Sequence, residues 1–247
     1  MDMGFNLVSL ATNHTLDRGV STNWKTIKSS REYWNKQENV IAAGSYATQK
    51  EKDEVIVKEK NGIKYGLLAY TTLTNGLTMP KDKRFYLNVY SDALAKKDIE
   101  ALRDKVDVLI VSMHWGIEYS HGVSPEQKAI AKYLSSLGVD IIIGTHPHVV
   151  EPIEYINNTL VIYSLGNFVS SQIGNEKLTG LVTAVDITKT TIDGKSVVKL
   201  SNTKADLVYT CKPNTCGKGK YKVYPYNKLN DSLLPNYKAE FKKNMDI

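Results

Sequence analysis

Four apolar runs of this chain end in asparagine or histidine, residue types that bind metal ions. The residues are Asn13 and His14, His114, His146 and His148, and Asn167. Neutral imidazole is the commonest metal ligand, and the amide oxygen of asparagine is a hard, neutral donor. This donor set suits a divalent ion such as Mn, Fe or Zn. The pattern predicts a metal site if the runs are strands whose ends lie together.

Each of these residues also has an ordinary interpretation. A single histidine at the end of a strand is usually a polar loop residue, and asparagine is common in loops. The chain has only five histidines, however, and the fifth, His121, lies in the same loop as His114. Ligands of open α/β sheets bind at the carboxyl ends of the strands, so the repeated pattern favours convergence on one site.

The first two thirds of the chain alternates between strand-like and helix-like patterns. Strands are expected at residues 5–11, 62–70, 106–113 and 139–143, and helices at 21–36, 91–105 and 124–138. The last helix has the clearest signals, because Ser124 suits the N-cap, Pro125 suits the first turn and Gln127 completes a capping box. Gly138 is expected to end this helix.

After residue 150 the pattern changes to strands without intervening helices. These strands are expected at residues 159–165, 180–188 and 195–201, and the Asp-Gly pair within 192–195 indicates a hairpin. Strand and helix units followed by antiparallel strands predict a mixed α/β fold. After about residue 203 the periodicity is weak, so this tail is expected to wrap the domain or to pack as an appendage.

Composition and charge are those of a soluble globular protein. The chain has 247 residues, 42% hydrophobic and 23% charged. No apolar run approaches the roughly 20 residues of a membrane span, and no signal peptide is visible, so we expect this chain to be soluble without an anchor. The net charge is +6, and residues 201–247 contain nine lysines and four acidic residues. This tail is either a solvated surface or a contact for an anionic polymer or surface. No nucleic-acid recognition motif occurs, so no nucleic acid is expected.

Cys211 and Cys216 are the two cysteines of the chain. Proline and asparagine between them indicate a turn that would bring them together. A small disulfide loop is the first interpretation, and it would argue for an oxidising compartment. Reduced thiols are the alternative. A zinc site is not favoured, because two thiols with no histidine nearby do not complete a tetrahedron.

Several short strings resemble, in order and spacing, the CapA/PgsA-like family of bacterial capsule synthesis proteins. The strings are GFNLVSLATNHTLDRG (4–19), HWGIEY (114–119), GTHPHVVEP (144–152) and IYSLGNF (162–168). Members of this family are associated with poly-γ-glutamate capsules. They are similar to calcineurin-like metallophosphoesterases, so the resemblance implies a four-layer α/β/β/α sandwich.

The resemblance also implies a metal centre. Asn13, His114 and His146 would share one ion, and His148 would bind the other ion of a two-metal site. Two metal ions can activate a water molecule and stabilise both oxygens of an in-line displacement.

The resemblance implies further roles for three residues. His14 would stabilise a phosphoryl-like transition state or protonate a leaving group. Glu118 would bind metal or hold a ligand histidine. Asn167 would line the site and contact the substrate.

This sequence departs from the family pattern at its beginning. Family members begin with two strands that end in Gly-Asp and Asn-Leu-Glu motifs, whose acidic residues complete the metal site, and neither motif occurs here. Two adjacent dications without a bridging carboxylate would repel each other strongly, so occupancy of a two-metal site depends on another acid. Asp2 and Asp17 are the candidates. We therefore expect an N-terminally incomplete domain at residues 1–202 and a basic C-terminal extension at 203–247 that packs on it.

Three functions follow as hypotheses. The first is an accessory protein for the synthesis or export of poly-γ-glutamate. The second is a metal-dependent hydrolase of phosphoester or γ-glutamyl bonds in cell-envelope material. The third is a structural protein without catalysis. The expected partners are an anionic polymer and other membrane-bound capsule synthesis proteins, and an exposed sheet edge would favour a homo-oligomer. The full-length protein is expected at the extracellular face of the cell membrane or at the cell surface.

Overall fold

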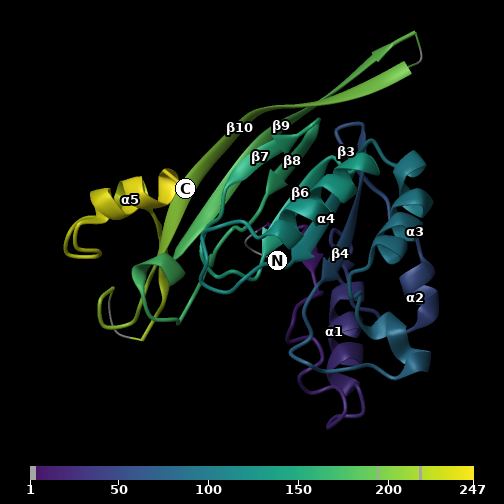
Figure 1. The fold of residues 1–247 in the computed structure, drawn as a ribbon, viewed down its shortest axis with the longest axis horizontal. Helices are drawn as coiled ribbons and strands as arrows, with labels where there is room; N and C mark the ends of the chain where they lie inside the picture. The colour runs from purple at the N-terminus through teal and green to yellow at the C-terminus, as the bar shows by residue number, and fades with distance from the viewer. Residues whose placement is uncertain (1–3, 194, 217–218) are drawn as a thin grey trace. The chain divides into compact units, whose positions relative to one another are not determined.

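The computed structural model describes residues 4–193, 195–216 and 219–247 (Figure 1). Asp2, one of the candidate acidic ligands, lies outside the described residues. The chain divides into two compact units. The first unit runs to Trp115 and includes Ala129–Ile142 and Ile156–Thr159, and the second comprises Gly116–Lys128, Ile143–Tyr155 and Leu160–Ile247.

The elements up to His114 belong to the first unit. Its strands are β1 (Leu7–Ser9), β2 (Ile41–Ala43), β3 (Lys58–Lys60), β4 (Ile63–Thr71) and β5 (Val108–His114). Its helices are α1 (Lys25–Asn35), α2 (Gln49–Asp53) and α3 (Asp92–Leu102), with 3₁₀ turns η1 (Lys81–Tyr86) and η2 (Arg103–Lys105). Strand β1 pairs in parallel with β2, and β4 pairs in parallel with β5 so that Thr71 lies opposite His114. The ends of β4 and β5 therefore lie at the same edge of the sheet.

The later elements complete the fold. They are α4 (Pro125–Ser136), β6 (Ile141–Thr145), β7 (Ile153–Ile156), β8 (Thr159–Ile162), η3 (Asn175–Lys177), β9 (Thr179–Ile192), β10 (Lys195–Cys211), β11 (Lys222–Pro225), η4 (Tyr226–Lys228) and α5 (Tyr237–Met245). A six-stranded sheet has the order β3-β4-β5-β6-β8-β7, and it is mixed because β3 runs antiparallel to β4. The predicted mixed α/β fold is confirmed.

Side-chain caps explain where two of the helices begin. The Ser91 side chain accepts a hydrogen bond from the Leu94 amide at 3.2 Å and starts α3. At α4, the backbone N–H of Gln127 donates to Ser124 Oγ at 3.2 Å, and the backbone N–H of Ser124 donates to Gln127 Oε1 at 2.8 Å. These two bonds are the reciprocal pair of a capping box, so the predicted start of this helix is confirmed.

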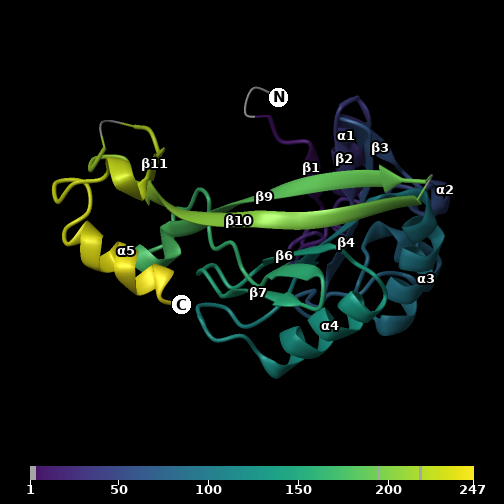
Figure 2. The ribbon, with the colours of Figure 1, turned by 90° about the horizontal axis from the view of Figure 1, so that it is seen from above.

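The hairpin of β9 and β10 is longer than the sequence pattern predicts. The two strands pair from Ile192 and Lys195 at the turn to Thr179 and Tyr209 at the base, and β10 continues to Cys211 (Figure 2). The irregular register between Ser201 and Lys204 interrupts the alternation of side chains, which hides the second half of the strand in the sequence. The boundary predicted between residues 202 and 203 lies inside β10.

The end of β10 has its own apolar core. Buried residues there include Leu207, Tyr209, Cys211 and Tyr226, and Phe241 of α5 packs against them. Helix α5 therefore lies beside the base of the hairpin, as Figures 1 and 2 show from two directions. In the part of the chain that the structure describes, no helix combines the length and the apolar character that crossing a bilayer requires.

Candidate functional site

The first unit gathers five polar residues from three segments, and we call them the Asn13 group. They are Asn13, His14 and Asp17 after β1, Asn75 after β4, and His114 at the end of β5. Gly44 allows the segments to approach closely. Its φ is +97°, and a Cβ at this position would lie 2.6 Å from the Cβ of Ala11 and 3.0 Å from that of Ala69. The absence of a side chain at Gly44 thus helps to position the residues that follow β1.

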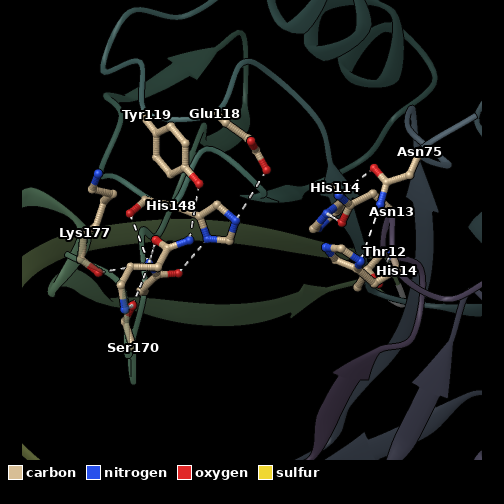
Figure 3. A network of polar contacts seen from close by, with 12 residues as sticks. Thr12, Asn13, His14, Asn75, His114, Glu118, Tyr119, His148, Ser170 and Lys177 are labelled. Atoms are coloured by element: carbon tan, nitrogen blue, oxygen red, sulfur yellow. Dashed lines mark hydrogen bonds and ion pairs between the residues drawn. The ribbon is translucent and has the colours of Figure 1, made fainter. Parts of the chain in front are cut away.

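Asn13 connects Asn75 to His114. Its Nδ2 donates to Asn75 Oδ1 at 3.1 Å, which leaves Oδ1 as the atom that faces His114. His114 Nε2–H donates to that Oδ1 at 2.9 Å. Asn13 is 5% exposed, so the orientation of its amide is set by these partners (Figure 3). The predicted neighbours Asn13 and His114 are thus in contact.

His14 lies next to a carboxylate. Its Nδ1 is 2.6 Å from Asp17 Oδ2 and 3.4 Å from Asn75 Nδ2. When Nδ1–H donates to the carboxylate, Nε2 is the nitrogen that can accept or release a proton at a substrate. Asp17 therefore contacts the histidine that the resemblance assigns to proton transfer. Asn75 is a member of the group that the sequence does not point to.

The second unit contains a group of three residues that can hold a metal ion, and we call it the Glu118 group. Glu118, His146 and His148 each offer one ligand atom, and these atoms lie within 4.8 Å of one another. His146 directly follows β6. The Tyr119 amide donates to the carbonyl of Pro147 at 2.7 Å and joins the loop of Glu118 to the His-Pro-His segment.

The backbone around the Glu118 group adopts conformations that L-residues seldom take. The φ angles are +101° at His146, +63° at His148 and +66° at Tyr119. Positive φ values at residues other than glycine cost free energy, on the order of 1–3 kcal/mol each, and they cluster at functional sites. The fold therefore holds both histidines in place against a local preference.

The ring of His148 has a defined tautomer. Asn167 Nδ2 lies near four acceptors, among them the carbonyls of His148 and Lys177 at 3.3 and 3.0 Å. Its Oδ1 therefore points the other way, and His148 Nδ1–H donates to it at 3.0 Å. The lone pair of Nε2 then faces Glu118 Oε1, which is 3.8 Å away (Figure 3). An unprotonated Nε2 opposite a carboxylate is the arrangement that a metal ligand needs.

Tyr119 packs on His148, and Lys177 packs on Tyr119 in turn. Tyr119 stacks on the imidazole ring, with centroids 5.8 Å apart, and Lys177 Nζ lies 4.6 Å from the centroid of the Tyr119 ring. Asn167 holds the ring from the side of Nδ1, so the structure places it behind the histidine. The contact of Asn167 with a substrate stays a prediction.

Other residues in these strings have structural contacts. His121 Nδ1–H donates to the carbonyl of Val150 at 2.7 Å, and Trp115 is fully buried. Cys211 and Cys216 form a disulfide, with Cα atoms 5.8 Å apart.

The donor atoms of the Glu118 group fit a divalent ion. Two imidazole nitrogens and one carboxylate oxygen are ligands that Mn, Fe and Zn accept, although they do not select one of these metals. The convergence of this group with the Asn13 group on one two-metal centre stays a prediction.

Comparison with known proteins identifies the family. The family model "Bacterial capsule synthesis protein PGA_cap" matches residues 1–172. PGA biosynthesis protein CapA of Bacillus subtilis (strain 168) is 32% identical over 181 residues, which are 69% of this chain and 44% of the relative. Capsule biosynthesis protein CapA of Bacillus anthracis is 32% identical over 175 residues, 69% of this chain and 41% of that protein.

A shorter match, 34% identical over 68 residues, covers 28% of this chain and 18% of a probable polyglutamine synthesis accessory protein of Mycobacterium tuberculosis. The chain spans less than half the length of both CapA relatives. The family match nevertheless covers more than half of the chain itself. The chain therefore belongs to the PGA_cap family of bacterial capsule synthesis proteins.

Proposed function

We propose that this chain contains the metal-binding centre of an accessory protein for the synthesis or export of a poly-γ-glutamate capsule. The observation that carries the proposal is the Glu118 group, in which Asn167 fixes His148 with the lone pair of Nε2 toward Glu118. Family membership supports the biological setting. We expect the four-layer sandwich of metallophosphoesterases around this centre.

Glu118, His146 and His148 would hold an ion, and Glu118 would supply the negative charge that the two imidazoles lack. Asn13 Oδ1 and His114 Nε2 would be a further ligand pair. They lie 2.9 Å apart in a hydrogen bond, so the proton on Nε2 would have to leave before this nitrogen could bind an ion. The bound ion would supply a Lewis acid and lower the pKa of a bound water.

A metal-dependent hydrolase is the second candidate, and the contact of His14 with Asp17 favours it. A histidine held by a carboxylate can pass a proton to a leaving group, because the carboxylate stabilises the imidazolium form. The bond cleaved would be a phosphoester or a γ-glutamyl amide of cell-envelope material. The proposed partners in either case are an anionic polymer and other membrane-bound capsule proteins, at the outer face of the cell membrane.

The test of metal binding is elemental analysis of the purified chain after incubation with Mn²⁺, Fe²⁺ or Zn²⁺ and removal of excess metal. We expect about one equivalent per Glu118 group. Glu118→Gln and His148→Ala should each lower the affinity for the metal at least tenfold, because each removes one of three ligands.

Glu126→Gln is the matched control. Glu126 is an exposed acid at the start of α4 and lies outside the Glu118 group. The control should bind metal like the unchanged chain. Equal metal content in Glu118→Gln, His148→Ala and the control would contradict the proposal.

The hydrolase candidate has a separate test. The metal-loaded chain is assayed with aryl phosphodiesters and with γ-glutamyl anilides, and His14→Gln and Asp17→Asn are compared with it. We expect rate losses of about 10² to 10⁴ for His14→Gln, the range that general acid catalysis contributes. A metal-loaded chain without turnover of either substrate would remove this candidate and leave the accessory function.

A further inference from the structure

The first unit contains a cavity of about 470 Å³ that the Asn13 group does not use. Its walls are mostly apolar, with Leu16, Leu77 and Leu87 among them, and Thr78 adds a hydroxyl. Two cationic side chains, Lys52 and Arg84, also line it, whereas none of its described lining residues is acidic. The cavity thus combines an apolar wall with positive charge.

The two cations form no ion pair within the described part of the chain, although the charges of Asp98 and Asp53 act on Lys52. Among the described residues, neither the Lys52 ammonium nor the Arg84 guanidinium forms a hydrogen bond or an ion pair. Lys52 is half-buried, and burial lowers the pKa of its ammonium, an effect that the charge of Asp98 partly opposes. Arg84 is exposed, and an anion bound between it and Lys52 would stabilise both positive charges.

The apolar wall narrows the chemical class of the anion. A bare inorganic anion would leave the leucine side chains without contacts, whereas a chain with methylene groups would cover them. The two cations of the lining favour a ligand that carries more than one negative charge. A chain that repeats a carboxylate and two methylene groups meets both requirements.

The cavity adjoins the Asn13 group through two chain neighbours. Leu16 lines the cavity and directly precedes Asp17, and Thr74 lines it and directly precedes Asn75. An anionic chain that is anchored in the cavity would therefore lie near the segments that carry Asp17 and Asn75. We infer that this cavity is a subsite for γ-glutamyl chains, in which Lys52 and Arg84 bind carboxylates while the leucines contact the methylene groups. The choice of chain rests on the proposed function.

The test is calorimetric titration of γ-linked tetraglutamate into the full chain at low salt. We expect binding, with at least a tenfold higher Kd for the double variant Lys52→Gln/Arg84→Gln. Lys28→Gln/Lys36→Gln removes the same charge from exposed positions in and after α1, so it should bind almost like the unchanged chain. Urea unfolding confirms that each variant is folded.

Two further ligands test which chemical class of ligand the cavity binds. The neutral γ-linked tetraglutamine should not bind, and inorganic tripolyphosphate should bind at least tenfold more weakly than tetraglutamate. Equal Kd values for the two double variants would overturn the inference, as would equal affinity for tripolyphosphate. No binding to the unchanged chain would overturn it too.

The outcome of the tetraglutamate titration can be distinguished from the outcome of the metal-binding test. His148→Ala should lose metal and keep the affinity for tetraglutamate measured without metal. If metal binding fails while tetraglutamate still depends on Lys52 and Arg84, the proposed function falls and the subsite stands. If tetraglutamate binding is unaffected by the Lys52 and Arg84 changes while metal binding depends on Glu118, only the subsite falls.

Discussion

His148 and Asn167 form a hydrogen bond that decides which imidazole nitrogen faces Glu118. Nδ1–H of the histidine donates to Oδ1 of the asparagine at 3.0 Å. The relationship depends on the orientation of the Asn167 amide, whose Nδ2 donates toward Lys177 O at 3.0 Å and lies 3.2 Å from Gln172 Oε1. Asn167 offers no ligand atom to the Glu118 group. It nevertheless sets the tautomer of His148, which does offer one.

Asn167→Ala should lower the affinity for metal by about 10- to 100-fold, the usual effect of losing a partner that orients a ligand histidine. The cause is a His148 ring that can rotate and carry its proton on either nitrogen. Metal titration followed by the absorption of bound Co²⁺ measures the change. Asn227→Ala, an exposed position in η4, is the matched control. Equal affinities in the two variants would mean that Asn167 has no part in holding the histidine.

Gly116 provides a second way to disturb the Glu118 group without touching a ligand. Its φ is +88°, and a Cβ there would lie 2.8 Å from the Gln127 side chain. Gly116→Ala should cost about 1–3 kcal/mol of unfolding free energy, because it strains the backbone and displaces Gln127 from the capping box. It should also weaken metal binding, since Glu118 is two residues away. Urea unfolding and metal titration measure the two effects.

Gly122→Ala is the control for that experiment. A Cβ at Gly122 would meet its nearest neighbour, Ser120 Oγ, at an ordinary 3.6 Å. A variant at this position should keep the stability of the unchanged chain within about 0.5 kcal/mol. If Gly116→Ala loses less unfolding free energy than Gly122→Ala, the close approach of Gly116 to Gln127 does not have the role assigned to it.

Local signals predicted much of the fold. The capping box of Ser124 and Gln127 acts within a single turn, so its residues can be read directly from the chain, and both hydrogen bonds are present. Short elements such as α2 and β3 carry too few residues for a periodic pattern and were not predicted. The second half of β10 was missed because the irregularity after Ser201 shifts the alternation on which strand prediction depends.

The candidate site was predictable where a residue type and its place at a strand end coincide. His114 and His146 meet that condition. Asn75 and Lys177 do not, because they matter through contacts with residues far away in the chain. Asn75 is 62 positions from Asn13, with which it shares a hydrogen bond, and its type is unremarkable for a loop. Such partners emerge only when the folded chain brings them together.

The disulfide gives a prediction about stability. Cys211 and Cys216 are separated by five positions, so their bond closes a short loop, and both are buried in the core at the base of the hairpin. Cys211→Ala/Cys216→Ala should lose about 2 kcal/mol, the entropy expected for so short a loop. A reductant should lower the unfolding midpoint of the unchanged chain and leave that of the variant unaltered. Detection of two free thiols in the unreduced protein by mass spectrometry would rule this out.

Glu151 is a buried acid with an unusual protonation equilibrium. It is 2% exposed, its Oε2 accepts from Gln127 Nε2 at 2.7 Å, and its Oε1 has no partner among the described residues. Burial raises the pKa of its carboxyl from 4.5 to about 7, while the hydrogen bond from Gln127 acts in the opposite direction. The folded chain therefore binds a proton that the unfolded chain releases between these two pH values. Stability must fall as the pH rises through this window.

Glu151→Gln should remove that dependence, because the neutral amide can still accept from Gln127 without the cost of a buried charge. The difference in unfolding free energy between Glu151→Gln and the unchanged chain should grow by about 3 kcal/mol from pH 4.5 to pH 8, in favour of the variant. Urea unfolding at several pH values measures it. Glu126→Gln, which alters an exposed acid, should show almost no such growth. A flat difference for Glu151→Gln would show that this carboxyl titrates normally in the folded chain.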